Sequence, residues 1–318
     1  MAASIKEVKV SCIIVNYNCF ELLDICLDTL KKFHTELNFE IIVVDNASTI
    51  GDPKLITDRY ENVILIKNES NKGFAYANNQ AINIASGDYT LILNNDIEFR
   101  SNVLIPLIEL LEKCGGKCFV APKLLNSNGS RQESIVEFPS LWNGITENLF
   151  LYKLFPKMKL FNKYYQNYID DTKPFETDVL KGALILCKTD DLNELNGFDS
   201  RFFFYSEETD LCFRFKKNGG KIWFYPHESV IHHGGAATKS IPWFNYKNQS
   251  IGKIKYYQKH FKGLSFSAAI IVHYIGLFLR GIIFSFTGIL SLNKNILMKG
   301  YYFFKQMFFY PKNEFKKI

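Results

Sequence analysis

Four short apolar segments alternate with helical segments over the first hundred residues. Helical periodicity covers about 20–34, 52–60 and 73–85, and another helix is expected to follow at about 101–114. The apolar runs are nearly continuous and rich in β-branched residues, which is typical of strands buried on both faces. The alternation predicts an α/β fold with a mostly parallel sheet and helices on both faces. The runs are VSCIIVNYN (10–18), FEIIVVDNAS (39–48), NVILIKNES (62–70) and YTLILNND (89–96).

Polar side chains gather where the predicted strands end. Open parallel sheets bind ligands at that carboxyl edge, so we expect a pocket there. Neither GxGxxG nor GxxxxGK[ST] occurs, which argues against the usual dinucleotide and P-loop sites. The residues are Asn16, Asn18, Asp45, Asn46, Asn94, Asn95 and Asp96.

The remaining chain adds three strand-like runs, at 118–125, 179–188 and 221–230. A helix is predicted at about 207–218, with Ser206 as its N-cap and Gly219 as its stop. No linker rich in Pro, Ser or Gly interrupts the chain. We therefore expect one catalytic domain at 1–245, followed by a helical appendage at 246–318.

Three carboxylates crowd the start of the predicted helix, in FFFYSEETDLCFRF (202–215). Glu207, Glu208 and Asp210 could simply compensate the helix dipole, with Asp210 paired to Arg214 four residues later. Alternatively, a positively charged partner is meant to sit among the three carboxylates. The positions of the three carboxylates, within residues 207–210, fit both interpretations.

A metal site is a further candidate. Asp96 closes an apolar strand, and IHHGG (231–235) follows another strand-like run. Asp96, the acidic start of the predicted helix, and His232 or His233 together would supply the oxygen and nitrogen ligands that suit Mn²⁺ or Mg²⁺.

Taken together, these motifs resemble the family-2 glycosyltransferases, and within them the rhamnosyltransferase-like branch. The resemblance implies the GT-A (Rossmann-like) fold, a nucleotide-diphosphate sugar donor, a divalent metal and inversion of the anomeric centre. The matching segments occur in the family's order: VSCIIVNYN, VVDNAST (43–49), NKGFAYANNQAI (71–82), LILNNDIEF (91–99), KGALILCK (181–188), NGFDSRFFFYSEETDLCFR (196–214) and HHGGAAT (232–238).

The resemblance also implies roles for the matched residues. Asp45 would contact the base or ribose of the nucleotide, beside Asn46 and Asn71. Gly73 would let the backbone approach closely at a helix N-terminus, where free N–H groups attract anions. Asp96 would close the metal-binding DXD motif, and His232 would be a second ligand, with His233 as the alternative. The nucleotide-sugar site would also include Asn16, Asn18, Asn94 and Asn95.

For catalysis, the resemblance makes Glu208 the general base, with Glu207 as the alternative and Asp210 in the same cluster. Two departures from the family pattern stand out. Glu208 occupies a position where Asp is usual, and Asn94 replaces the first DXD carboxylate, which removes one negative charge from the metal site.

The net charge of +6 is unevenly distributed. From Lys239 to Ile318 there are 13 Lys and Arg against one acid, which is +12 and leaves −6 for the rest. The same region contains an apolar stretch, 264–292, interrupted by His273 and Arg280. This segment could span a membrane, lie in its surface or pack as a lid, and Arg280 near its middle favours the surface form. A nucleic-acid partner is disfavoured because no groove-reading motif accompanies the charge.

Seven cysteines without a CxxC pair indicate reduced thiols, and MAASIKEVKV lacks an apolar signal core. We therefore expect a cytoplasmic enzyme at the inner face of the cell membrane. It would be an inverting glycosyltransferase using Mg²⁺ or Mn²⁺, with L-rhamnose from dTDP-rhamnose as the expected donor. The acceptor would be a glycan or lipid-linked glycan in cell-surface polysaccharide synthesis. A non-catalytic nucleotide-sugar or glycan-binding module on the same fold is the alternative.

Overall fold

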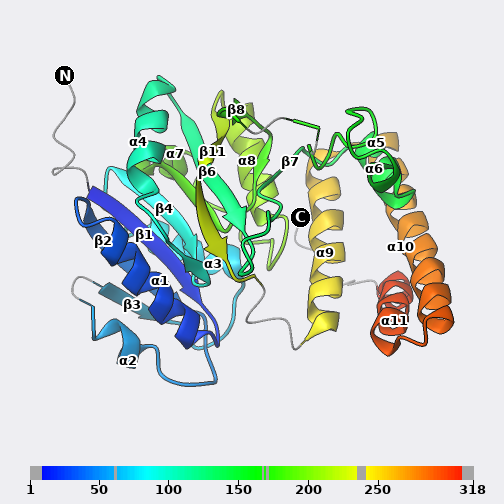
Figure 1. Cartoon of the computed structure of the whole chain (residues 1–318), viewed down its shortest axis with the longest axis horizontal. Coiled ribbons are helices and arrows are strands. Elements are labelled where there is room, and N and C mark those ends of the chain that lie inside the picture. The colour runs from blue at the N-terminus through cyan, green and yellow to red at the C-terminus, as the bar shows by residue number, and fades with distance from the viewer. Residues whose placement is uncertain (1–8, 61–62, 167, 170–171, 235–240, 310–318) are drawn as a thin grey trace. The chain divides into compact units, whose positions relative to one another are not determined.

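The computed structural model describes residues 9–60, 63–166, 168–169, 172–234 and 241–309 (Figure 1). Two compact units emerge. The sheet unit comprises 1–136, 170–203 and 207–237, and the helical unit comprises 137–169, 204–206 and 238–318. Segment 137–169 therefore belongs with the C-terminal helices, while the domain boundary expected at 245 remains a prediction. Residues 1–8, 235–238 of the HHGGAAT motif, and 310–318 of the tail lie outside the described residues.

The sheet unit follows the predicted strand–helix alternation closely. Its first half contains β1 (Lys9–Asn16), α1 (Phe20–Phe33), β2 (Asn38–Asp45), α2 (Lys54–Thr57), β3 (Val63–Lys67), α3 (Phe74–Ile82), β4 (Tyr89–Asn94), β5 (Ile97–Glu98), α4 (Leu104–Lys113), β6 (Cys118–Leu125) and β7 (Ile135–Val136). Its second half contains β8 (Phe175–Glu176), β9 (Val179–Leu180), β10 (Leu184–Lys188), α7 (Thr189–Glu194), α8 (Glu207–Lys217) and β11 (Lys221–His232).

The main sheet has the order β3-β2-β1-β4-β10-β6-β11-β5 within the described residues, with β8 alongside β11. Strands β1 to β4 pair in parallel, as do β6 and β11, whereas β10 runs antiparallel between β4 and β6. The expected mostly parallel α/β sheet is confirmed. The single strand predicted at 179–188 is wrong, because a turn in which the Ala183 N–H donates to the Lys181 carbonyl divides it into β9 and β10.

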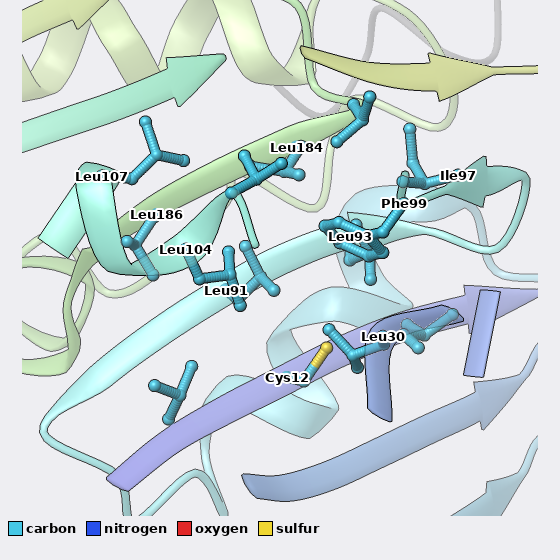
Figure 2. Packing of buried hydrophobic residues seen from close by; sticks show 14 of the residues in the cluster. Cys12, Leu30, Leu91, Leu93, Ile97, Phe99, Leu104, Leu107, Leu184 and Leu186 are labelled. Carbon is cyan, nitrogen blue, oxygen red and sulfur yellow. The ribbon is translucent and has the colours of Figure 1, made fainter. Parts of the chain in front are cut away.

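Helices cover both faces of this sheet, as predicted. On one face, α1 and α4 pack over alternate residues of the central strands. Figure 2 shows Leu91 and Leu93 of β4 beside Leu184 of β10 and Leu104 of α4, all in one buried apolar cluster. On the other face, Phe215 of α8 stacks on Phe119 of β6 with ring centroids 3.7 Å apart. Burial on both faces explains why the strand sequences are continuously apolar.

The helical unit contains α5 (Leu141–Asn148), α6 (Leu151–Leu154), α9 (Pro242–His260), α10 (Leu264–Leu290) and α11 (Lys294–Phe308). The predicted C-terminal helical region is therefore present. Helix α10 is long and apolar enough to cross a membrane by length and composition alone.

Candidate active site

The carboxyl ends of β1, β2 and β4 bring three predicted site residues into one hydrogen-bonded chain. Asn16 Nδ2 donates to Asp45 Oδ1 at 3.0 Å, and Asn95 Nδ2 donates to Asn16 Oδ1 at 2.8 Å. Ser48, which had no predicted role of its own, donates from its hydroxyl to Asp45 Oδ1 at 2.6 Å and from its N–H to Oδ2 at 3.0 Å. The Asp45 carboxylate is thus buried and fixed in orientation, with acceptor capacity left for a ligand.

Asn18 shapes the loop after β2. Its side-chain oxygen accepts the N–H groups of Thr49 and Ile50, at 2.7 and 3.1 Å, and its own N–H donates to the Ser48 hydroxyl at 2.8 Å. Asn18 therefore holds the loop that positions Ser48 against Asp45.

Asn46 joins the end of β2 to the turn before α3. Its amide nitrogen donates to Asn71 Oδ1 at 2.9 Å and to the Gly73 carbonyl at 3.2 Å. Asn71 Oδ1 also accepts the Gly73 N–H at 3.0 Å. The three residues assigned to the nucleotide pocket by resemblance are therefore in direct contact.

Gly73 permits a close backbone approach, and in the structure the approaching chain is Phe203. Gly73 has φ of +92°, and a Cβ there would lie 2.9 Å from the Phe203 Cα. The N–H of Phe74 donates to the Phe203 carbonyl at 2.9 Å. The aromatic segment before α8 is thereby held at the start of α3, and this first N–H of the helix already has a protein partner.

Asp96 and His232 form a close pair at the same edge. Asp96 Oδ1 lies 3.2 Å from His232 Nε2, yet this buried oxygen has no hydrogen-bond partner in the structure. A buried carboxylate oxygen without a partner is costly, and a bound cation is one way to satisfy it. The pair therefore fits a divalent ion as two of its ligands.

The described part of the chain holds no group of three or more His, Cys, Asp and Glu side chains arranged for a metal. Two protein ligands would thus need oxygens from a bound diphosphate to complete the coordination of Mg²⁺ or Mn²⁺. His233 is placed elsewhere, with Nε2 3.1 Å from Glu98 Oε2 and Nδ1 2.9 Å from the Ser127 hydroxyl. The geometry brings the ring of His232, not that of the alternative His233, to the Asp96 carboxylate, while the His233 N–H donates to the Asp96 carbonyl at 3.0 Å.

Gln132, which sequence reasoning missed, controls the orientation of His232. Its amide nitrogen donates to Asn126 Oδ1 at 3.0 Å and to the His232 carbonyl at 3.2 Å, so its oxygen must face the ring. That oxygen lies 2.6 Å from His232 Nδ1 and can only accept, which places the proton on Nδ1. The lone pair of Nε2 then points towards Asn94 Nδ2, at 3.3 Å, and Asp96. No motif spacing marks Gln132, because only the pairing of β6 with β11 brings its loop to His232.

The three carboxylates of α8 occupy different environments. Glu207 is buried, and its Oε2 has no hydrogen-bond partner. Burial, together with the neighbouring Glu208, raises the pKa of Glu207 well above its usual value. Asp210 is fully buried and accepts a hydrogen bond from Arg214 Nε at 2.8 Å, which confirms the predicted pairing across one helical turn. Glu208 is the partly exposed member of the three.

The turn before β10 connects α8 with the end of β4. A Cβ at Gly182 would lie 3.3 Å from the Glu208 Cβ, so the turn and this glutamate are in contact. The adjacent Ala183 carbonyl accepts the Asn94 N–H at 2.9 Å, and Asn94 contacts His232. The acidic cluster and the Asp96–His232 pair therefore belong to one edge of the sheet.

Comparison with known proteins identifies the family. Residues 11–182, more than half of the chain, match the model of glycosyl transferase family 2. The chain belongs to this family. It is therefore a glycosyltransferase that uses a nucleotide-sugar donor, which confirms the predicted class of enzyme and argues against the non-catalytic module.

Two curated relatives are rhamnosyltransferases by name. The glycosyltransferase is 27% identical over 221 residues to the N-acetylglucosaminyl-diphospho-decaprenol L-rhamnosyltransferase of Mycobacterium tuberculosis, covering 65% of this chain and 71% of the relative. It is also 27% identical over 232 residues to the rhamnosyltransferase WbbL of Escherichia coli K12, covering 67% and 82%.

A solved structure shares the fold. The mannosyltransferase PcManGT from Pyrobaculum calidifontis, in complex with GDP-Man and Mn²⁺, superposes with a TM-score of 0.59 at 16% identity. The likeness covers 97% of this glycosyltransferase and 88% of that chain. The predicted GT-A fold is thus confirmed.

Removal of either candidate metal ligand should weaken metal-dependent donor binding. We expect Asp96→Ala to reduce Mn²⁺ affinity more than His232→Ala, because Asp96 carries the negative charge. Mn²⁺ titration in the presence of a nucleoside diphosphate, followed by calorimetry, measures the effect. His233→Ala is the matched control and should bind Mn²⁺ normally. Wild-type metal affinity in both Asp96→Ala and His232→Ala would show the coordination to be wrong.

Replacing Gln132 should affect the metal through His232 alone. Gln132→Leu removes the acceptor at Nδ1, so the ring can place its proton on Nε2 and lose its lone pair for a cation. Loss of such an outer partner typically lowers metal affinity roughly 10- to 100-fold. Gln132→Glu keeps an acceptor and should retain more affinity than Gln132→Leu in the same titration. Equal Mn²⁺ affinities for Gln132→Leu and the wild type would contradict this role.

Proposed function

We propose that this glycosyltransferase is an inverting, metal-dependent rhamnosyltransferase that transfers L-rhamnose from dTDP-rhamnose to a lipid-linked glycan in cell-surface polysaccharide synthesis. The observation that carries the proposal is the gathering, at one sheet edge, of the Asp45 pocket, the Asp96–His232 pair and the α8 carboxylates. The names of the two rhamnosyltransferase relatives support the choice of sugar. One of these names includes a lipid diphosphate acceptor, which supports the choice of acceptor class.

Different residues of this sheet edge bind different parts of the donor. Asp45, fixed by Ser48 and Asn16, accepts hydrogen bonds from the base or ribose. Asn46 and Asn71 hold the adjoining turn around the nucleotide. Asp96 and His232 would hold Mg²⁺ or Mn²⁺, which when bound neutralises charge on the leaving diphosphate.

Glu208 is the proposed general base. Burial and the neighbouring Glu208 raise the pKa of Glu207, which favours its protonated form and disfavours it as the acceptor of the hydroxyl proton. Glu208 is partly exposed, and its contact with the Gly182 turn places it beside the end of β4. Removal of the hydroxyl proton lets the acceptor oxygen attack the anomeric carbon opposite the departing diphosphate, and this single displacement inverts the centre.

Asp210 supports this arrangement from within the fold. Its carboxylate is fully buried against Arg214, which also donates to the carbonyls of Leu195 at 2.9 Å and Gly197 at 2.7 Å. These contacts tie α8 to the segment that precedes it. Asp210 therefore positions Glu207 and Glu208 rather than exchanging protons itself.

The proposed location is the cytoplasmic face of the cell membrane, where a lipid-linked acceptor would reside. The helical unit carries 17 Lys and Arg against three acids. Each such cation near an anionic leaflet contributes about 1 kcal/mol of attraction. The charge distribution therefore supports work at a membrane surface.

A nucleotide screen tests the donor. Thermal unfolding of the full chain should shift most with dTDP plus Mn²⁺, less with UDP or GDP plus Mn²⁺, and little with any nucleotide in EDTA. Ligand at 100 times its Kd stabilises the folded state by about 2.7 kcal/mol. Turnover is then followed as release of dTDP from dTDP-rhamnose. A larger shift and faster release with UDP- or GDP-sugars would contradict the proposed donor.

The base assignment is tested by isosteric amides. Glu208→Gln should keep the fold and dTDP binding but lose about 10²- to 10⁴-fold in turnover, because the amide cannot take the hydroxyl proton. Glu207→Gln is the matched control and should retain most activity. An inactive Glu207→Gln with an active Glu208→Gln would exchange the two roles.

A further inference from the structure

Helix α10 presents an exposed apolar stripe along one side. Its members recur at intervals of three and four residues, which places them on one helix face. Over 271–290 the stripe is about 30 Å long, at 1.5 Å per residue. Exposed apolar surfaces of this extent mark interaction sites. The stripe consists of Ile271, Ile275, Phe278, Ile282, Ile283, Phe286, Ile289 and Leu290.

The opposite side of α10 is packed inside the helical unit through small residues. A Cβ at Gly288 would lie 2.5 Å from the backbone nitrogen of Leu297, and one at Gly300 would lie 2.7 Å from that of Ser285. The backbones of α10 and α11 therefore touch, in an antiparallel hairpin. Close small-residue packing of this kind holds helices together where burial of apolar surface contributes little, as it does in lipid.

The only charged residue of α10 points to this packed side. Arg280 donates to the side chain of Asn148 and, at 3.0 Å, to the carbonyl of Glu147. The Glu147 carboxylate also accepts a hydrogen bond from Lys253 Nζ at 2.8 Å, and the two cations lower its pKa. His273, on the same side, shares a 2.8 Å hydrogen bond with the Ser250 hydroxyl. Arg280 and His273 are thus hydrogen-bonded to partners within the helical unit, and the stripe carries no charge.

This arrangement argues against a spanning α10. If α10 crossed a bilayer, Arg280 would lie near its centre and would draw Glu147 and Lys253 there with it, at a high cost. Helix α11 has 15 residues, or about 22 Å, and cannot cross the roughly 30 Å apolar core. The hairpin fits a membrane only when it lies along the surface.

We infer that the helical unit docks side-on to an anionic lipid bilayer, with the α10 stripe inserted at the boundary between headgroups and acyl chains. The inference rests on the proposed membrane-linked acceptor. Helices α9, α10 and α11 contain no acidic residue, and α9 and α11 together contribute seven lysines. Anionic headgroups complement this charge, whereas a second copy of the same face would repel it.

A pocket beside the stripe is also suited to bilayer lipid. It has a volume of about 420 Å³ and lies between α9 and α10, lined mainly by Ile254, Phe266, Ile270 and Ile271. Ile271 belongs to both the pocket and the stripe. An acyl chain of a bilayer lipid could enter the pocket from the docked face.

Vesicle co-sedimentation of the full chain tests the inference. Wild-type protein should bind vesicles of phosphatidylglycerol and phosphatidylcholine, and bind phosphatidylcholine alone weakly. The double variant Ile275→Glu/Ile282→Glu should lower partitioning about tenfold or more, since two inserted apolar side chains are replaced by charges that anionic lipid repels. The matched control, Leu55→Glu/Ile84→Glu, changes two apolar residues of the sheet unit that are at least as exposed, and it should bind as the wild type does.

Three results would overturn the inference. These are equal partitioning of the stripe variant and the wild type, resistance of membrane-bound protein to alkaline extraction, and a change from oligomer to monomer in the stripe variant without lipid. Should the double variant fail to fold, Ile282→Trp replaces it. Its added fluorescence should then shift to shorter wavelength on anionic vesicles, unlike that of Leu55→Trp. Calorimetric titration with dTDP and Mn²⁺ should be the same for the stripe variant and the wild type, so loss of docking is separable from failure of the proposed donor chemistry.

Discussion

The antiparallel pairing of β10 with β4 is the constraint on which the candidate active-site edge depends. Its register, with Leu184 opposite Leu93, brings the turn before β10 to the end of β4. That turn contacts Glu208 on one side and Asn94 on the other. A second pairing, of β11 with β5, sets His232 opposite Ile97 and so brings it to Asp96 from a distant part of the chain. The Asp45 group, the Asp96–His232 pair and the acidic start of α8 thereby share one edge.

Two carboxyl groups at that edge are buried in a way that would be unfavourable if their role were only structural. Asp96 Oδ1 and Glu207 Oε2 are both buried without hydrogen-bond partners. Each costs free energy in the protein alone, on the order of 1–3 kcal/mol for a neutral group and more for a charged one. The amides of Asn16, Asn46 and Asn95, by contrast, donate hydrogen bonds within the edge. Buried carboxyl oxygens without partners are typical of groups that bind a ligand, a proton or a cation.

Helix α10 separates its charged and apolar side chains more completely than its sequence indicates. Arg280 and His273 interrupt an apolar stretch, yet both face partners within the unit. The outward side of α10 is left apolar and uncharged, while lysines occupy the neighbouring helices. The ion pairs of Glu147 with Arg280 and Lys253 therefore allow an apolar helix to carry a central charge without exposing it on the outer face.

The sequence by itself determined the α/β alternation, the polar strand ends and the family, because hydrophobic periodicity and ordered motifs are local properties of the chain. It also placed Asp45 beside Asn46, and Asp210 one helical turn from Arg214, since neighbours in strands and helices have fixed geometry. Only the tertiary structure decided that 179–188 breaks into two strands, that the His232 ring rather than the His233 ring meets the Asp96 carboxylate, and that Gln132 orients the His232 ring. Only the tertiary structure decided that the Arg280 side chain faces partners within the helical unit. These contacts join residues up to 136 positions apart, and no local pattern specifies which distant partners a fold brings together.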